Sequence, residues 1–344
     1  MSGINIAVVG ATGAVGQVVL SILEERNFPV GDLRLLASKR SAGTRVSVLG
    51  QELEVGEAAP DSFDGTDIVF FAAGGSTSQT LAPEAAKRGA VVVDKSSAWR
   101  MDPAVPLVIP EINPDDIREH KGIISSPNCS TIVMLMALAP LHRANPIQRV
   151  IVDTYQSASG AGGKGIVELM QQTRDVLDQK APSHSTFPAT LAFNALPHVE
   201  DFSEDDYTTE EIKMESETRK ILHLPDLPVS ATCVRVPVPI SHSEAVHIEF
   251  ANHMSPADAR DILSEFPGVR VIDDIASKSY PLADYAAGKD EIFVGRIRSD
   301  KAFTNGLSIW TVGDNLRKGA ALNAVQIAEA LLEQGLAGSV GNGR

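Results

Sequence analysis

The sequence predicts an α/β protein in which a doubly wound parallel sheet is followed by an α+β domain built on a mixed sheet. In the first part of the chain, short apolar runs alternate with helical or loop segments, a rhythm typical of parallel strands joined by crossovers. In the second part, longer and more alternating strands are separated by long helices, which favours a mixed or antiparallel sheet. With 344 residues, the chain is long enough for two domains of common size.

The first domain is expected to end where the sequence changes character, near residue 129. Its predicted strands are Ile4–Val9, Leu33–Leu36, Ile68–Phe71, Val91–Val93 and Ile123–Ile124. An amphipathic helix is expected over Gln17 to Arg26, and an apolar helix over Thr131 to His142. The apolar helix opens the second domain.

The second domain is predicted to carry longer strands than the first. These strands are Arg149–Gln156, Val229–Val238, Ala245–Phe250, Glu291–Arg298 and Leu307–Val312. A last helix, Arg317 to Leu332, is expected to return and pack on the first domain. We therefore assign residues 1–128 plus about 313–344 to the first domain and residues 129–312 to the second.

The composition excludes several classes of protein. Acidic residues outnumber basic ones, 44 against 30, so a nucleic-acid partner held by phosphate contacts is disfavoured. Two cysteines give no disulfide framework and suit a reducing, cytoplasmic location. The N-terminus lacks the features of a signal peptide, and the longest apolar stretch, Ile132 to Leu141, is too short to span a bilayer. We expect no membrane role and no metal site.

A glycine-rich turn follows the first predicted strand and leads into a helix. Backbone N–H groups and a helix N-terminus in such a turn can bind a pyrophosphate, although the glycine spacing is looser than the usual G-x-G-x-x-G form. A tight turn without a ligand is the alternative, because glycine also serves backbone geometry. The expected cofactor contacts are Gly10, Thr12, Gly13, Ala14, Val15 and Gly16.

The end of the second strand indicates which cofactor binds. An NAD enzyme usually carries an acidic residue there for the ribose hydroxyls, but this chain reads Ala37-Ser38-Lys39-Arg40-Ser41. Ser38, Arg40 and Ser41 therefore favour the 2′-phosphate of NADP. A solvated polar loop is the alternative for each of them taken alone.

Cys129 lies just before the apolar helix, where the positive end of the dipole and unpaired N–H groups stabilise a thiolate. The alternative, an inert core cysteine, is the interpretation that we give Cys233. Arg235 lies among valines on a strand, so its guanidinium group needs an anion or water as a partner. His242, in the turn before the next strand, could reach a nucleophile as general base, although many histidines are only packed or solvated.

Six segments together resemble one family, the aspartate-semialdehyde dehydrogenases, in the family's order and over nearly the whole chain. They are Gly10 to Gly16, Ser126-Pro127-Asn128-Cys129-Ser130-Thr131, Tyr155-Gln156-Ser157-Ala158-Ser159-Gly160, Glu210-Glu211-Ile212-Lys213, Arg235-Val236-Pro237-Val238 and His242-Ser243-Glu244. The resemblance implies a Rossmann-like NADP-binding domain and a catalytic and dimerisation domain. It also implies NADPH-dependent, reversible reduction of aspartyl phosphate to aspartate semialdehyde and phosphate, in amino-acid biosynthesis, by a homodimer.

The resemblance further implies a role for each matching residue. Cys129 would be the nucleophile, Gln156 would orient the bound intermediate, and His242 would be the acid/base. The implied substrate contacts are Arg235 for the α-carboxylate, Glu210 for the amino group, and Lys213, Arg100 and Asn128 around the phosphate. The remaining implied cofactor contacts are Ser159, Gly160 and, at the nicotinamide end, Asn315.

Alternatives remain open at this point. Glu210 and Lys213 could form an exposed ion pair on a helix, and Asn315 could be a helix N-cap. N-acetyl-γ-glutamyl-phosphate reductases share the two-domain plan but usually carry glycine before the nucleophile, where this chain has Asn128. Acyl-CoA reductases, and a catalytically inactive relative that serves as a binding subunit, are the other candidates.

Overall fold

The computed structural model describes residues 3–337, which divide into two compact units. Of the described residues, those up to Pro127 and those from Ala320 on form the first unit, and Asn128–Gly319 form the second. The sequence predicts that the chain returns to the first domain near residue 313. In the structure it returns at Ala320, and the segment between the last strand and Ala320 belongs to the second unit. Within residues 3–337, no helix combines the length and the apolar character needed to cross a membrane.

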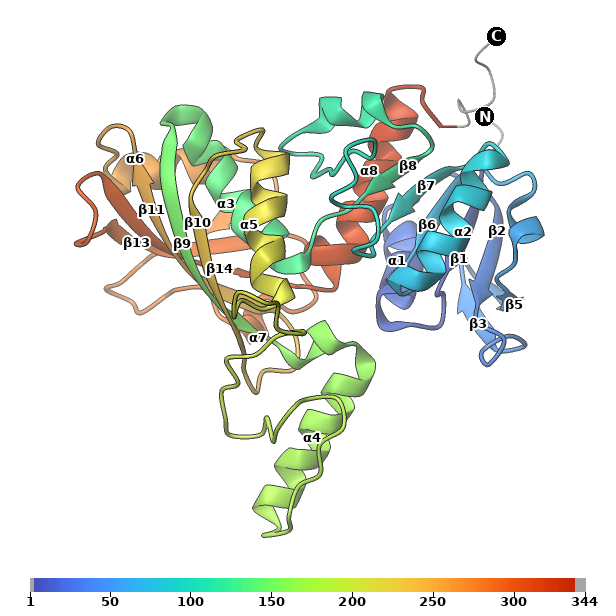
Figure 1. Ribbon diagram of the computed structural model, residues 1–344, viewed down its shortest axis with the longest axis horizontal. Coiled ribbons are helices and arrows are strands. Elements are labelled where there is room, and N and C mark those ends of the chain that lie inside the picture. Colours follow the sequence, from blue (N-terminus) through green and yellow to red (C-terminus); the bar gives the residue numbers. More distant parts are fainter. Residues whose placement is uncertain (1–2, 338–344) are drawn as a thin grey trace. The chain divides into compact units, whose positions relative to one another are not determined.

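The first unit is built on a parallel sheet with strand order β5-β2-β1-β6-β7-β8 (Figure 1). The strands are β1 (Ile4–Val9), β2 (Val30–Ala37), β5 (Gly56–Glu57), β6 (Ile68–Phe71), β7 (Val91–Asp94) and β8 (Ile123–Ser125). Every strand predicted for this domain is present. A small hairpin, β3 (Arg45–Val48) with β4 (Gln51–Glu54), was not predicted.

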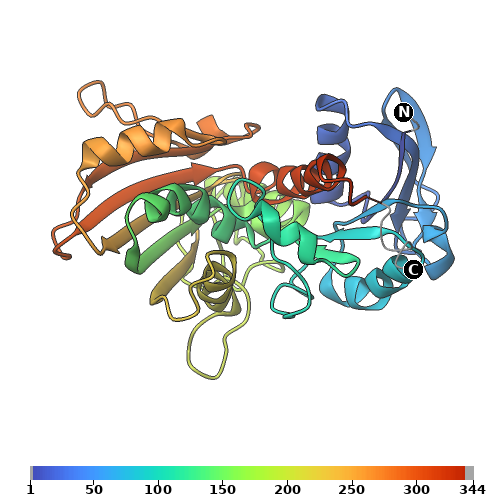
Figure 2. The same cartoon turned by 90° about the horizontal axis from the view of Figure 1, so that it is seen from above.

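Helices cover both faces of this sheet, which makes it doubly wound as predicted (Figures 1 and 2). Side chains of α1 (Ala14–Glu25) and α8 (Leu322–Glu333) share one apolar cluster with strand residues such as Ile6 and Val8. Side chains of α2 (Gly75–Lys87) share another with Ala7 and Val9. The alternation along β1 therefore places neighbouring residues in different cores.

The second unit is built on a mixed sheet with strand order β10-β9-β11-β14-β13-β12, in which the β10–β9 and β12–β13 pairs are parallel and the others antiparallel. Its strands are β9 (Ile147–Gln156), β10 (Val229–Arg235), β11 (His242–Phe250), β12 (Val269–Val271), β13 (Ile292–Ser299) and β14 (Gly306–Gly313). Its helices are α3 (Cys129–Ala144), α4 (Gly163–Leu177), α5 (Thr209–Ile221), α6 (Pro256–Glu265) and α7 (Ala283–Ala286). The mixed sheet of the prediction is thus present.

One face of the mixed sheet is buried beneath α3, which lies between α5 and α6, while α4 extends away from the sheet (Figure 1). In β9, Val150, Val152 and Thr154 face the helices and are buried, whereas Ile151 and Tyr155 point to the other face and are exposed. α3 is apolar around its whole circumference because sheet and helices surround it.

Several predicted boundaries were wrong. The first helix begins at Ala14 instead of Gln17, because Gly13 is its N-cap. β10 ends at Arg235 instead of Val238, where Pro237 cannot donate to a ladder. The strand after it already begins at His242, which pairs with Gly313 and therefore does not lie in a turn. The last helix, in contrast, begins at Arg317 as predicted, with a π-helical turn, Arg317–Ala321, that continues into α8.

A carboxyl group, that of Glu244, is fully buried in the middle of the mixed sheet. It is paired across the strands with Thr154 and Thr311, and Thr311 Oγ1 donates to its Oε2 at 3.3 Å. Its Oε1 has no hydrogen-bond partner within the described part of the chain. Burial raises the pKa of Glu244 well above its usual value, and the nearby charge of Glu210 adds to this, so the fold favours the protonated carboxyl group.

We expect Glu244→Gln to stabilise the protein relative to wild type, and increasingly so as the pH rises. The unfolded state loses the Glu244 proton above a pKa of about 4.3 while the folded state keeps it, so wild-type stability falls as pH rises, by up to about 1.4 kcal/mol per pH unit. Urea unfolding of both proteins between pH 5 and 8 measures the difference, which should grow with pH. The exposed Glu52→Gln is the control, and a difference that does not depend on pH would contradict the expectation.

Candidate active site

Cys129 occupies the first position of α3. The N-cap is Asn128, whose Oδ1 accepts hydrogen bonds from the backbone N–H groups of Ser130 (2.9 Å) and Thr131 (3.3 Å). The half-buried Cys129 therefore lies at the positive end of the helix dipole, and the helix begins two residues earlier than the predicted start at Thr131. Its Sγ is 3.3 Å from Nε2 of His242, which the structure brings to it from the start of β11.

Asn128 is itself held by two buried carboxylates of α5, those of Glu210 and Glu217. Its Nδ2 donates to both oxygens of Glu210, at 3.0 and 2.9 Å, and its backbone N–H donates to Glu217 Oε2 at 2.6 Å. Glu210 and Glu217 are two turns apart on one face of the helix. Glu217 is missing from the predicted site, although an acidic residue two turns from Glu210 was a signal that could have found it.

Glu210 also binds Gln156. Gln156 Nε2 donates to Glu210 Oε1 at 2.9 Å, and Thr154 Oγ1 donates to Gln156 Oε1 at 3.1 Å. Burial raises the pKa of Glu210, but the charge of Lys213 and the hydrogen bonds from Gln156 and Asn128 outweigh it and keep the pKa below its usual value. Glu210 is therefore a buried carboxylate rather than part of an exposed ion pair.

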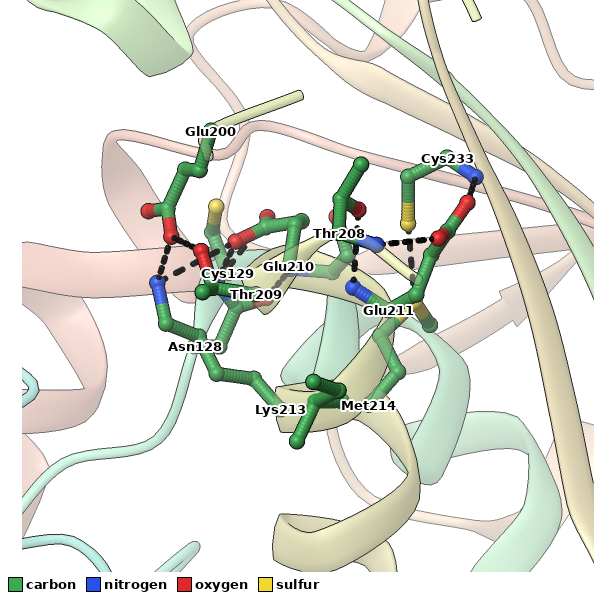
Figure 3. A network of polar contacts seen from close by, with 12 residues as sticks. Asn128, Cys129, Glu200, Thr208, Thr209, Glu210, Glu211, Lys213, Met214 and Cys233 are labelled. Carbon is green, nitrogen blue, oxygen red and sulfur yellow. Dashed lines mark hydrogen bonds and ion pairs between the residues drawn. The ribbon is translucent and has the colours of Figure 1, made fainter. Parts of the chain in front are cut away.

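Lys213 Nζ lies 3.5 Å from Glu210 Oε2. It also forms an ion pair with Glu200, which comes from the loop before α5 (Figure 3). One fifth of its side chain is exposed, so the ammonium group lies at the border between the buried network and solvent. A cation in this position is accessible to a small anion.

Arg235, the last residue of β10, lies beside Gln156 in the parallel pair and is buried. Its Nη1 donates to the carbonyl oxygen of Ser157 at 2.8 Å. Burial lowers the pKa of Arg235, while the charges of Glu210 and Cys129 raise it. A Cβ on Gly160 would lie 2.5 Å from Arg235 Nη1 and 3.3 Å from His242 Cε1, so only glycine leaves both side chains in place.

Asn315 is not a helix N-cap. Its Oδ1 accepts hydrogen bonds from the hydroxyl groups of Ser157 (3.2 Å) and Ser159 (2.9 Å) and from the backbone N–H of Ser241 (3.0 Å). The neighbouring Asp314 caps the following turn instead. Asn315 and Ser159 thus lie in the surroundings of His242, and contact with a nicotinamide stays a prediction.

The glycine-rich turn lies in the first unit, where the carboxyl ends of β1, β2 and β6 border a cavity of about 460 Å³. Predicted contacts that line this cavity are Gly10, Thr12, Gly13, Ser38, Arg40 and Ser41, and Glu57 and Thr77 also line it. Ala14, Val15 and Gly16 form the first turn of α1, which has no side-chain cap. Gly10 has a φ of 85°, and a Cβ there would lie 2.7 Å from the carbonyl oxygen of Ala72. The turn therefore needs glycine for its geometry whether or not it binds a ligand.

Arg100 belongs to the first unit and is buried. Its Nε donates to the carbonyl oxygen of Ser126 at 3.1 Å and its Nη2 to that of Lys95 at 2.8 Å. These bonds fix the guanidinium between β7 and the end of β8. Its contact with a phosphate stays a prediction.

The second unit thus holds the parts of a covalent catalyst. A thiol at a helix N-terminus lies next to an imidazole, and a buried guanidinium, a buried carboxylate and an amide surround them. Such a set can add a thiolate to a carbonyl carbon while binding a small substrate that carries both charges.

The chain matches two family models, described as semialdehyde dehydrogenase, NAD binding domain (residues 5–120) and semialdehyde dehydrogenase, dimerisation domain (residues 138–318). It is 54% identical to an aspartate-semialdehyde dehydrogenase of Aquifex aeolicus, over 97% of this chain and 99% of that protein. A crystal structure of aspartate semialdehyde dehydrogenase II from Vibrio cholerae, complexed with ASA, is similar with a TM-score of 0.94 at 43% identity, covering 97% and 99% of the two chains. The enzyme of Candida albicans, solved with NADP, has a TM-score of 0.76 at 25% identity and covers 98% and 100%.

We expect Glu217→Gln to lower the free energy of unfolding by about 1–3 kcal/mol, because a buried charged acceptor of the Asn128 N–H is replaced by a neutral amide. Glu215→Gln on the exposed side of the same helix is the control, with a change within about 0.5 kcal/mol. Urea unfolding of the two variants checks this. Equal stability of the two would show that Glu217 does not hold the start of α3.

Proposed function

The chain belongs to the aspartate-semialdehyde dehydrogenase family and is an oxidoreductase that acts on an aldehyde, and from that premise we propose its full reaction. It reduces L-aspartyl 4-phosphate to L-aspartate 4-semialdehyde and phosphate with NADPH, reversibly, through a thioester on Cys129. The observation that carries the proposal is the position of the Cys129 sulfur, at the N-terminus of α3 and 3.3 Å from His242 Nε2.

In the oxidative direction the Cys129 thiolate adds to the aldehyde carbon and forms a C–S bond. His242 Nε2 lies where it can share a proton with the oxygen of this adduct. The bound nicotinamide supplies the hydride acceptor. Loss of the hydride leaves a thioester on Cys129, and attack by phosphate on the thioester carbon releases the acyl phosphate and the thiolate. Biosynthesis runs these steps in reverse.

Charge matching supports aspartyl compounds as substrates. Arg235 offers a guanidinium to the α-carboxylate, and the ionised Glu210 offers its charge to the α-ammonium group. Gln156, which Glu210 holds, lies between them and can orient the bound intermediate. Lys213 at the border with solvent and Arg100 in the first unit are the cations that we assign to the phosphate, with Asn128 positioning the nucleophile.

The cavity in the first unit fits a dinucleotide. It lies at the carboxyl ends of β1 and β6, where the strand order reverses, and the uncapped first turn of α1 offers N–H groups to a pyrophosphate. We assign the 2′-phosphate of NADP to Ser38, Arg40 and Ser41 on its wall. Glu57 from β5, Lys39 and Arg40 also line the cavity, so its wall carries charges of both signs.

We also propose that the enzyme is a cytoplasmic homodimer, formed through the face of the mixed sheet that the helices leave uncovered. Tyr155 and Trp310 pack together there with ring centroids 5.4 Å apart, and Ile151 is exposed nearby. Tyr155 and Trp310 border a cavity of about 600 Å³ that Arg296 and Arg298 also line. A second copy of the sheet would bury these aromatic rings, and the matching family model is described as a dimerisation domain.

The decisive experiment is phosphate-dependent reduction of NADP⁺ by L-aspartate semialdehyde. We expect Cys129→Ala to lose activity at least about a thousandfold, because no thioester can form. Cys233→Ala is the matched control, since Cys233 is buried and burial raises the pKa of its thiol, and it should stay within a few-fold of wild type.

The same assay tests the finer assignments. NAD⁺ in place of NADP⁺ should react more slowly, and CoA in place of phosphate should give no acyl product. Activity that survives Cys129→Ala would refute the covalent mechanism, and a reaction with CoA but not with phosphate would identify an acyl-CoA reductase.

We expect Arg235→Lys to raise the KM for aspartate semialdehyde at least about tenfold, because an ammonium group cannot bind a carboxylate through two parallel hydrogen bonds. The exposed Arg270→Lys in β12 is the control. Initial rates at varied semialdehyde concentration check this. An unchanged KM in the Arg235 variant would rule out its contact with the α-carboxylate.

A further inference from the structure

The carboxylate of Glu200 is held by two donors from α5. Its Oε2 accepts a hydrogen bond from Thr209 Oγ1 at 2.8 Å and forms an ion pair with Lys213 Nζ (Figure 3). Thr209 and Lys213 are four residues apart, so they lie on the same face of the helix. One anionic oxygen is therefore bound between a hydroxyl group and an ammonium group.

We propose that Glu200 Oε2 occupies the position of a phosphate oxygen, so that Glu200 must leave Lys213 before phosphate binds there. Thr209 is then a further phosphate contact, and Glu200 sets the affinity of the site for phosphate. The inference deepens the proposed function and rests on it, since it concerns the anion that attacks the thioester.

This anion position is linked to the groups around the nucleophile. Lys213 Nζ is 3.5 Å from Glu210 Oε2, and both oxygens of Glu210 accept from Nδ2 of Asn128, the residue before the nucleophile. Burial lowers the pKa of Arg235, while charges that include those of Glu210 and Glu200 raise it. The Glu200 carboxylate therefore lies within electrostatic reach of the guanidinium that we assign to the substrate.

The Glu200 side chain can leave while its two donors stay in place. It is 43% exposed, against 20% for the side chain of Lys213, and so it borders solvent. The loop on either side of it is anchored, because Val199 is buried and the carbonyl oxygen of Asp201 accepts from the backbone N–H of Thr209 at 2.9 Å. A rotation about the side-chain bonds of Glu200 therefore uncovers both donors without a change in the backbone.

Glu200 and phosphate compete, because two anions in contact repel each other and both need the same donors. A site that Glu200 fills for most of the time binds phosphate with an apparent affinity that is reduced in proportion to the unfilled fraction. In the biosynthetic direction phosphate is a product, and the return of Glu200 to Lys213 then favours its release. The carboxylate thus weakens phosphate binding in both directions of the reaction.

Glu200→Gln and Glu200→Ala test the competition. We expect each to lower the KM for phosphate at least about fivefold in the oxidative direction, and to change the KM for aspartate semialdehyde less than about twofold. Initial rates are measured at varied phosphate concentration and constant ionic strength, because salt screens exposed charges. The exposed Glu204→Gln in the same loop removes an equal charge and should leave the KM for phosphate within about twofold of wild type. An unchanged KM for phosphate in both Glu200 variants, or an equal fall in Glu204→Gln, would overturn the competition.

Thr209 is tested in a protein where the Glu200 carboxylate no longer competes for it. In the Glu200→Gln background, we expect Thr209→Val to raise the KM for phosphate at least about fivefold, because it removes a hydrogen bond to a charged group. Thr209→Ser keeps the hydroxyl group and should retain the lower KM. A KM that is the same with and without the hydroxyl group would show that Thr209 does not contact phosphate.

Calorimetric titration with inorganic phosphate separates this inference from the proposed function. The titration needs no cofactor and no turnover, and we expect phosphate to bind Glu200→Gln at least about fivefold more tightly than wild type. Tighter binding without any phosphate-dependent reduction of NADP⁺ would refute the proposed function and leave the anion position in place. Full activity with equal phosphate affinity in the two proteins would refute the inference and leave the proposed function in place.

Discussion

The negative charge of Glu210, buried beneath the mixed sheet, organises the second unit. It accepts hydrogen bonds from Asn128 and Gln156, so the start of α3 and the end of β9 are tied to one carboxylate. A buried charge is stable only when it is fully paired, and here Lys213 and two amides pair it. The position of Cys129 follows, because Asn128 caps the helix that Cys129 begins.

The charged groups around Cys129 have different structural roles. Glu210 and Glu217 hold Asn128 and face inward, and Arg235 is fixed by the Ser157 carbonyl oxygen with only a small part exposed. Groups that are already fixed lose little freedom when a substrate binds. A substrate with separate positive and negative charges therefore meets partners that are already oriented.

The environment of His242 depends on this framework as well. Gln156, the last residue of β9, donates a hydrogen bond to Glu210. The backbone N–H of the next residue, Ser157, points at the imidazole of His242. Asn315, from the segment after β14, completes the contact by accepting from both Ser157 and Ser241. The His242 ring is thus held beside the Cys129 sulfur by contacts from the end of β9 and from the segment after β14.

The sequence by itself determined the fold class and most strands, because alternation and apolar runs report directly on which faces are buried. It also identified the segments that carry Cys129, Gln156, Arg235 and His242, through a resemblance that extends over the whole chain. It misplaced the ends of elements, such as the start of α1, where a cap decides the boundary.

Only the tertiary structure decided which groups meet. Glu217 and Ser157 contribute through contacts with residues far away in sequence, one of them through a backbone N–H, and neither a motif nor a periodicity records such a contact. The tertiary structure also showed that Asn315 accepts hydrogen bonds rather than capping a helix. A hydrogen bond depends on the distance and direction between two atoms, and those are set only when strands and helices from distant parts of the chain pack together.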